Sequence, residues 1–362
     1  MAITMPEPSG GEPSAKRAFA VVRLANEWYA ACRTTDLGRL PIARTILGEP
    51  LVLFRGEGGR PVALLDRCAH RNLPLSRGRV VEGRLVCAYH GWRYDGDGVC
   101  RLVPGLGAAD DDGKGRRVPS RPVREQQGFV WVFAGGGPPD VEPFRFPHLD
   151  DPRYTTVTAA VSVEATLLST LENQLDVPHT AVLHRGLFRG GTRHEITAIV
   201  RRFADRVEAE FVGEPRPGGL AGRLLAPEGG TVAHVDRFIL PSISQVEYRL
   251  GERSHLSITN ALTPETDFTT RFHAVISFRL PLPGLLVRAV VSPVARWIMA
   301  QDARILRLQT ETVRRFGEER YVSTPIDLLG PHIWRLLKDA EAGRISAAST
   351  EPAAEKVVTL VV

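Results

Sequence analysis

The stretch CAHRNLPLSRG at residues 68–78 is followed by a second stretch, CAYHGWRYD, at residues 87–95. Each begins with a cysteine and has a histidine two or three positions later: Cys68 with His70, and Cys87 with His90. One such pair cannot surround a metal ion by itself, but two loops that face each other offer two thiolates and two imidazoles. The pattern therefore predicts a metal centre to which each loop gives one cysteine and one histidine.

Two thiolates and two imidazoles fit a Rieske [2Fe-2S] cluster, in which two histidines replace two cysteines on one iron. A structural zinc site with the same four ligands is the alternative. Zinc fingers take both cysteines from one element and both histidines from another, whereas each loop here supplies one of each, which favours the cluster. Cys32 and Cys100 have no histidine at a matching distance, so we expect them to be buried thiols.

The two stretches resemble the Rieske domain of the Rieske-type non-haem iron oxygenases. Gln127–Phe133 (QGFVWVF) resembles the closing strand of that domain, and Asn26–Ala30 (NEWYA) resembles its entry segment. The resemblance covers nearly the whole chain. It implies an all-β domain that holds the [2Fe-2S] cluster through the two cysteines and two histidines named above.

A second informative stretch lies near the middle of the chain. Its leucines recur at three- and four-residue intervals, which predicts a helix over Ala165–Gln174. Asp176 and His179 are three positions apart and would share one side of a helix. His179 and His184 are five apart, about 140° around a straight helix, so a straight helix would not bring both to one ion. Pro178 would kink or end the helix, and a bent segment can bring the two imidazoles together.

Two histidines and one carboxylate form the facial triad of non-haem Fe(II) oxygenases. For the carboxylate we favour Asp302, because a carboxylate in line with apolar side chains points inward and needs a partner. On a helix over Trp297–Phe316, Asp302 shares its face with Ile305, Leu306, Gln309, Val313 and Phe316. The alternatives are an ordinary surface position for Asp302, and Asp267 as the ligand in its place.

The stretch Glu172–His184 resembles the mononuclear iron motif of the same family, D-x2-H-x4-H. The resemblance implies that His179 and His184 bind the iron. It further implies that Asp176 bridges a ligand histidine and His90 of the partner subunit, and that Asn173 lies close to the iron. A carboxylate beside a ligand histidine would fix the tautomer and the orientation of that ring.

The length of 362 residues exceeds what one hydrophobic core usually serves, so we expect two domains. Short strand-like runs come before the glycine- and proline-rich stretch Gly135–Pro139, and longer alternating runs come after it. The fold class is therefore α+β: an all-β Rieske domain and an antiparallel-sheet catalytic domain, for which the resemblance implies a helix-grip-like fold. The expected division is a disordered leader at 1–17, an entry segment at 18–40, the Rieske domain at 41–139, the catalytic domain at 140–347 and a tail at 348–362.

The net charge of +5 suggests at first a nucleic-acid or membrane partner. Most of the positively charged residues are arginines, and they are spread along the chain rather than clustered. No nucleic-acid partner is therefore expected. The longest apolar stretch, Leu280–Ala300, is interrupted by prolines and arginines, which argues against a membrane-spanning helix. The N-terminus has no apolar signal core, and we expect a cytoplasmic protein.

These motifs predict the terminal component of an oxygenase that contains a [2Fe-2S] cluster and a mononuclear Fe(II). A separate NAD(P)H-dependent reductase, with or without a ferredoxin, is expected to supply electrons, because the chain has no glycine-rich nucleotide fingerprint. Together with O2, the enzyme would hydroxylate, demethylate or otherwise oxidise an aromatic or lipophilic small molecule. The chain length resembles the demethylase and monooxygenase branch, which implies a homotrimer. The alternatives are a Rieske electron-transfer protein without oxygenase activity and a zinc-dependent nucleic-acid-binding protein.

Overall fold

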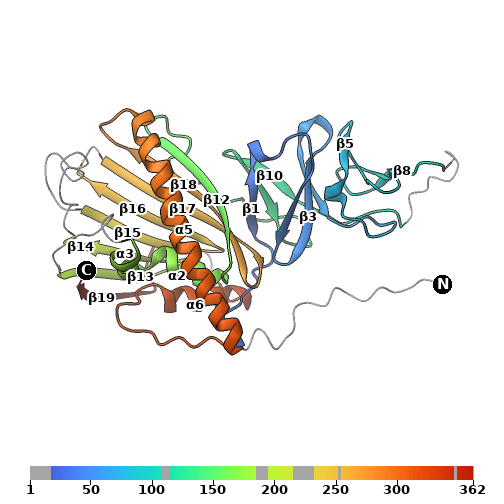
Figure 1. Cartoon of the computed structure of the whole chain (residues 1–362). Helices are drawn as coiled ribbons and strands as arrows, with labels where there is room; N and C mark the ends of the chain where they lie inside the picture. Colours follow the sequence, from blue (N-terminus) through green and yellow to red (C-terminus); the bar gives the residue numbers. More distant parts are fainter. Residues whose placement is uncertain are drawn as a thin grey trace.

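The structure, a computed structural model, describes residues 18–106, 115–184, 195–214, 232–251, 254–345 and 349–361. The expected leader at 1–17 lies outside these residues. Figure 1 shows a smaller part built of strands and a larger part in which helices cross a broad sheet. This arrangement confirms the predicted α+β class.

The smaller part contains three antiparallel sheets, in the orders β1-β11-β10, β2-β3-β4-β9 and β5-β6-β7-β8. Short 3-10 turns at Thr34–Asp36, Glu57–Gly59 and Leu75–Arg77 lie between the strands. The strands are β1 (Trp28–Arg33), β2 (Ile42–Ile46), β3 (Glu49–Arg55), β4 (Pro61–Leu65), β5 (Arg79–Val81), β6 (Arg84–Val86), β7 (Arg93–Tyr94), β8 (Cys100–Leu102), β9 (Ser120–Arg121), β10 (Val123–Gln126) and β11 (Phe129–Phe133).

Turn chemistry and burial explain two of these strand assignments. The apolar run at 80–87 is not one strand but the hairpin β5–β6, because Glu82 and Gly83 both adopt positive φ, as a two-residue hairpin turn requires. All five residues of β11 are buried, which fits a strand covered on both faces.

The larger part is one antiparallel sheet in the order β12-β18-β17-β16-β15-β14-β13-β19. Its strands are β12 (Thr155–Val163), β13 (Glu195–Arg202), β14 (Arg206–Val212), β15 (Val232–Ile239), β16 (Ile243–Leu250), β17 (Ser254–Thr266), β18 (Thr269–Arg279) and β19 (Ala354–Val361). The expected tail at 348–362 thus contains β19, which pairs with β13 along its whole length. Alternating apolar residues of β19, Val358 and Leu360, are buried there, which gives this edge strand a reason to stay on the sheet.

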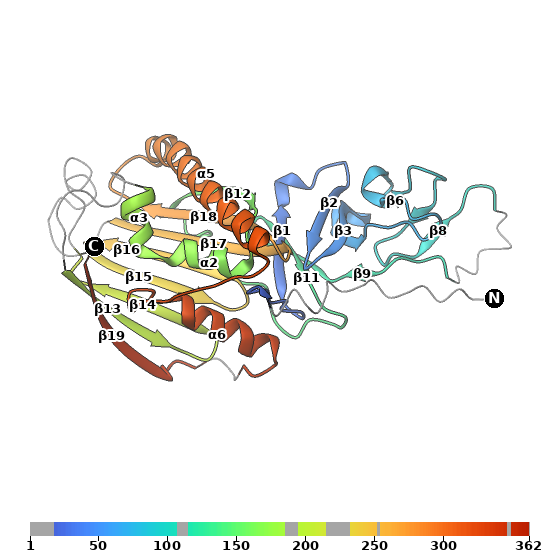
Figure 2. The same ribbon diagram turned by 60° about the horizontal axis from the view of Figure 1, so that its bottom comes forward.

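Helices α2 (Leu167–Leu175), α3 (Val177–Leu183) and α5 (Gly284–Phe316) lie across one face of this sheet (Figures 1 and 2). Helix α5 begins well before the predicted start at Trp297 and continues through Pro293. Its first half is held by an apolar cluster in which Val287 packs with Ile276 and Phe278 of β18. Tertiary packing therefore outweighs the backbone hydrogen bond that Pro293 cannot donate.

Helix α6 (Gly330–Glu341) is absent from the sequence prediction. Its buried residues Ile333, Leu336 and Leu337 join the main core, in which Leu171 of α2 also lies. None of the helices in the described part of the chain combines the length and the low polarity that crossing a bilayer requires.

The two parts are joined by a shared apolar cluster and by hydrogen bonds. Trp28 and Phe129 of the smaller part pack with Ile243 and Val275 of the larger sheet. The Thr263 hydroxyl donates to the carbonyl oxygen of Ala30 at 2.7 Å. These contacts fix the position of the helices and the sheet relative to the strand-rich part.

Candidate functional site

The two cysteine–histidine loops have the same backbone design. In the first loop, Cys68 donates its N–H to Leu73, and Asn72 donates to the Cys68 carbonyl. In the second, Cys87 donates to Trp92, and Gly91 donates to the Cys87 carbonyl, so the offsets of four and five residues are repeated. The residue four places after each cysteine, Asn72 or Gly91, has positive φ, which asparagine and glycine tolerate better than other residues.

These turns bring the four predicted ligands to one place. Cys68 and Cys87 are both buried, and the His70 and His90 ring centroids are 4.5 Å apart. The His70 ring stacks on Trp92 at 4.6 Å, and its Nδ1 atom is buried without a hydrogen-bond partner in the described part of the chain. An imidazole nitrogen that is buried and unpartnered beside two thiols fits a ligand of a [2Fe-2S] cluster.

A hydroxyl group supports the thiol side of this site. The Tyr94 hydroxyl lies 3.2 Å from Sγ of Cys68 and 3.3 Å from the backbone nitrogen of Ala69. Hydrogen bonds to sulfur are among the features by which a protein tunes a cluster's potential. The residues present therefore fit a Rieske cluster.

The second predicted site is built where α2 gives way to α3. The helix breaks at Asp176, whose backbone is extended, and not at Pro178, which lies in the first turn of α3. Proline suits this position because the first turn of a helix has no partner for its N–H. The Asp176 carboxylate caps α3 by accepting the His179 N–H at 3.0 Å. His184 lies at the end of α3, so the two histidines converge without a straight helix between them.

His179, His184 and Asp302 form one group. Their ligand atoms all lie within 4.8 Å of one another, close enough to hold a single metal ion. Oδ1 of Asp302 is 3.1 Å from Nε2 of His184 and 3.9 Å from Nε2 of His179. His184 and Asp302 are buried, and His179 is partly exposed. Two imidazoles and one carboxylate that converge on one position fit the donor set of a non-haem iron.

Each histidine of this group also has a partner on its other ring nitrogen. Nδ1 of His184 lies 2.8 Å from Oε1 of Gln301, and Nδ1 of His179 lies 2.5 Å from the carbonyl oxygen of Asp176. Such partners fix the ring so that Nε2 faces the metal position. Asn173 donates to Oδ1 of Asp302 at 3.4 Å, which places its amide beside the group as expected.

The charges of these side chains are coupled. Burial raises the pKa of Asp302 above its usual value, and the two histidines act against that rise. Burial alone would lower the pKa of His179, but the hydrogen bond and charge of Asp176 outweigh it and raise the pKa. A cation bound between these side chains would favour the ionised carboxylate and the neutral imidazoles.

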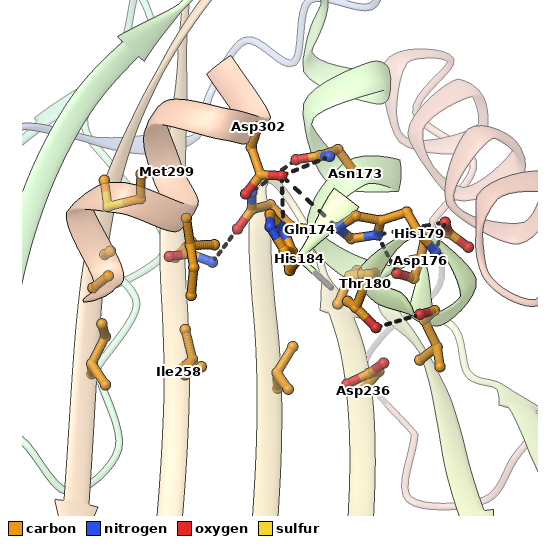
Figure 3. A pocket seen from close by; sticks show the side chains of 18 of the residues that line it. Asn173, Gln174, Asp176, His179, Thr180, His184, Asp236, Ile258, Met299 and Asp302 are labelled. Atoms are coloured by element: carbon orange, nitrogen blue, oxygen red, sulfur yellow. Dashed lines mark hydrogen bonds and ion pairs between the residues drawn. The ribbon is translucent and has the colours of Figure 1, made fainter. Parts of the chain in front are cut away.

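A cavity opens beside this group, between the helices and the sheet (Figure 3). Its empty space is about 910 Å³, solvent at the mouth included. Most of the wall is apolar, with Ile258 from the sheet and Met299 from α5. Asn260 of β17 donates to Gln174 of α2 at 3.0 Å and ties the sheet to the helix at the cavity. The volume suits a small organic molecule held next to the His179–His184–Asp302 group.

The structure separates the two candidate carboxylates. Asp302 faces the histidines, whereas Asp267 forms a two-point ion pair with Arg23. The buried face of α5 near the site runs through Leu306 and Thr310, while Ile305 and Phe316 of the predicted face are exposed. Phe316 is exposed because the end of α5 extends beyond the sheet (Figure 1). Ile305 lies beside the face formed by the buried residues Asp302, Leu306 and Thr310, which recur at four-residue intervals.

Sequence reasoning missed three polar residues of the site. Gln301 is adjacent to Asp302, but no sequence pattern indicates that it reaches His184. His234 and Asp236 lie on the buried face of β15 together with Val232 and Phe238, because every second residue of this strand is buried. Polar residues on the buried face of a strand were the signal that could have identified them.

Comparison with known families finds two matches. The model of the Rieske [2Fe-2S] domain matches residues 27–121, and that of the vanillate O-demethylase oxygenase C-terminal domain matches residues 163–342. Together they contain all the residues of both candidate sites.

Individual proteins give the same result. Chlorophyllide a oxygenase of Chlamydomonas reinhardtii is 29% identical over 90% of this chain. The oxygenase component of dicamba O-demethylase of Stenotrophomonas maltophilia is 38% identical over 44% of this chain. The chain spans about half the length of both relatives (50% and 47%).

Solved structures extend the likeness in fold to nearly the whole chain. Dicamba monooxygenase bound to dicamba is 25% identical, with a TM-score of 0.75 over 89% of this chain and 98% of that one. NdmA of Pseudomonas putida CBB5 with caffeine is 22% identical, with a TM-score of 0.70 over 94% and 98%.

Proposed function

Because the chain belongs to the Rieske-type non-haem iron oxygenases, we propose that it is the terminal oxygenase component of a multi-protein system. It takes electrons that originate from a separate NAD(P)H-dependent reductase, directly or through a ferredoxin. With O2 it hydroxylates, demethylates or otherwise oxidises an aromatic or lipophilic small molecule. Among its relatives, the oxygenase of dicamba O-demethylase is named for removal of an O-alkyl group, which makes demethylation one outcome to test.

One observation carries this proposal: two imidazoles and a carboxylate meet at the wall of an apolar cavity, in a chain that also has a Rieske domain. An electron-transfer protein would have no use for the second group or the cavity. When bound, the cluster and the iron supply the electron-transfer and oxygen-activating chemistry of the family.

The chain's own residues have separable roles in this proposal. His179, His184 and Asp302 would hold the iron at the wall of the cavity, and three protein ligands of this kind would leave room for O2 to bind. Gln301 and Asp176 fix the orientation of the two imidazoles. The apolar wall excludes water from around the substrate and holds it beside the iron position.

A homotrimer is proposed as the working assembly. Figure 1 shows the β5 and β8 end of the Rieske domain far from α3, at the opposite end of the molecule. Within one chain the cluster loops and the iron ligands therefore lie apart. An oligomer in which Asp176 faces His90 of the partner subunit removes this separation. We also propose a cytoplasmic location, since Cys32 and Cys100 are buried free thiols, which suit a reducing compartment.

The test of this function combines metal analysis with oxygen uptake. The proposed oxygenase requires about three irons per chain, and a cluster-only carrier requires about two. Purified protein with a surrogate reductase and NADH should consume O2 in response to members of a panel of aromatic and polycyclic compounds. Two irons per chain, with no substrate-dependent uptake, would support the electron carrier instead.

Electron transfer between subunits has its own test. Chains with Cys87→Ala lack a cluster ligand, and chains with His179→Ala lack an iron ligand. Neither variant should turn over alone, but mixed oligomers refolded or co-expressed from both should regain activity. Failure of mixed oligomers to regain any activity would count against a trimer in which Asp176 faces His90 of the partner subunit, and the iron count would still decide the oxygenase function.

A further inference from the structure

The cavity wall holds a second charged group, formed by Glu214, His234 and Asp236. Nδ1 of His234 lies 2.7 Å from Oε2 of Glu214, and its Nε2 lies 2.9 Å from Oδ1 of Asp236. Both carboxylates accept from the same ring, so the ring carries both protons and is an imidazolium. All three side chains are buried.

The sheet holds this imidazolium in place. His234 on β15 is paired across the sheet with Phe211 of β14 and Tyr248 of β16, and its ring stacks between theirs, with centroids 4.5 and 4.1 Å apart. Burial by itself would lower the pKa of His234. The charges and hydrogen bonds of Asp236 and Glu214 outweigh it and raise the pKa to about 9. The ring is therefore charged and fixed at neutral pH.

The Glu214–His234–Asp236 group determines which side chain is available to a ligand in the cavity. Both N–H groups of His234 are directed at carboxylates and so are engaged. Asp236 lines the cavity, and its carboxylate has acceptor capacity beyond the one bond from His234. Figure 3 shows Asp236 on the strand side of the cavity, apart from Asp302 and the two iron-site histidines. No lysine or arginine is among the described residues of the lining.

Resting on the proposed oxygenase function, we propose that Asp236 determines substrate specificity by accepting a hydrogen bond from the substrate. The cavity then takes a mainly apolar ring compound that carries an N–H or ammonium group. Ring compounds that carry a carboxylate are disfavoured, because a second anion would meet Asp236 in a region of low dielectric constant. His234 and Glu214 are positioning residues, because the His234 ring holds Asp236 on one side and is itself held by Glu214 on the other.

The test measures binding, not turnover. The holoenzyme without reductase, under argon, is titrated with three probes of similar shape: 1-naphthylmethylamine, 1-naphthalenemethanol and 1-naphthoate. The amine should bind best, at least about tenfold more tightly than the carboxylate, as expected for a charge-assisted hydrogen bond against a like-charge contact. In Asp236→Asn the two affinities should come within about threefold of each other. The control is Asp150→Asn, which removes an exposed ion pair with Arg145 and should keep the preference.

Several outcomes would overturn the proposal: naphthoate binding at least as tightly as the amine, no saturable binding of the amine, or an unchanged preference in Asp236→Asn. The relative affinities of the wild-type protein for the three probes test the proposal even if Asp236→Asn does not fold. Addition of reductase, NADH and O2 separates this proposal from the function on which it rests. An amine that binds at Asp236 but causes no oxygen uptake would count against the oxygenase function alone, whereas coupled oxidation of naphthoate in preference to the amine would count against Asp236 alone.

Discussion

Nε2 of His184 lies 3.1 Å from Oδ1 of Asp302, although one residue ends α3 and the other lies in the middle of α5. Asp302 and Gln301 are neighbours in sequence, and both reach the same imidazole, one at each ring nitrogen. The position of α5 across the sheet therefore determines both the third candidate iron ligand and the orientation of the second. This relationship makes the ligand set open to single-residue tests.

Asp302→Ala should remove the mononuclear iron and leave the cluster in place. The two histidines would keep only part of the donor set, so turnover should fall at least about 100-fold. Iron analysis should drop from about three to about two per chain, with an unchanged visible spectrum. The matched control is Asp267→Ala, which breaks the ion pair with Arg23 and should keep three irons. Loss of iron in Asp267→Ala and not in Asp302→Ala would show that Asp267, and not Asp302, binds the iron.

Gln301→Ala should weaken iron binding without abolishing it. The His184 ring would lose the partner that fixes its orientation, and such losses lower metal affinity by about 10- to 100-fold. Competition with a chelator, followed by iron analysis, measures the change. Gln309→Ala, on an exposed part of the same helix, is the control. Equal iron retention in both variants would show that Gln301 does not support His184.

Asp176→Asn should slow electron transfer and keep both metals. Asparagine retains an oxygen that can cap α3 through the His179 N–H, so folding should change by less than about 1 kcal/mol. The negative charge beside His179 is lost, and we expect at least about a tenfold slower re-oxidation of the reduced cluster in single-turnover mixing with O2 and substrate. A variant that loses the cluster, or transfers electrons at the wild-type rate, would contradict the bridging role.

Stability should depend on pH through His234. Its pKa is about 9 in the folded protein against 6.5 for an unperturbed histidine, so the folded state binds the proton more tightly. The resulting stabilisation is complete below pH 6.5 and is lost as the pH rises through 9. Its size is about 3 kcal/mol. Urea unfolding should therefore show the advantage of wild type over His234→Gln shrinking between pH 6.5 and 9.

A second histidine variant controls this pH experiment. Burial and nearby Arg202 lower the pKa of His332, so the folded state binds the proton of this residue less tightly than the unfolded state. The advantage of wild type over His332→Gln should therefore not shrink between pH 6.5 and 9. If the advantage of wild type over His234→Gln does not shrink either, His234 is not held as an imidazolium.

Gly78→Ala should destabilise the cluster domain. An added methyl group would collide with the carbonyl oxygen of Val86, in a backbone approach that allows no side chain. We expect a loss of about 2–4 kcal/mol in the free energy of unfolding, with less cluster bound per chain. Thermal unfolding and the visible spectrum measure both effects. Gly136→Ala, where an added methyl group would meet nothing, should match the wild type.

Local sequence patterns carried much of the prediction. The longer alternating runs after Gly135–Pro139 indicated an antiparallel sheet, because alternation with period two is typical of a half-buried strand. The two cysteine–histidine stretches indicated the cluster for a similar reason, since each loop is a local turn. The prediction was least accurate where packing between distant segments decides the outcome, as at the start of α5 and at α6.

The sequence by itself determined the family, the two-part α+β plan and the residues of both motifs, because all of these depend on spacing within short segments. Only the tertiary structure decided between Asp302 and Asp267, and it alone placed His234 and Asp236 at the cavity wall. The physical reason is that a carboxylate gains its role from its neighbours across the fold. Asp267 meets an arginine and becomes an ion pair, whereas Asp302 meets two imidazoles and completes a set of metal donors.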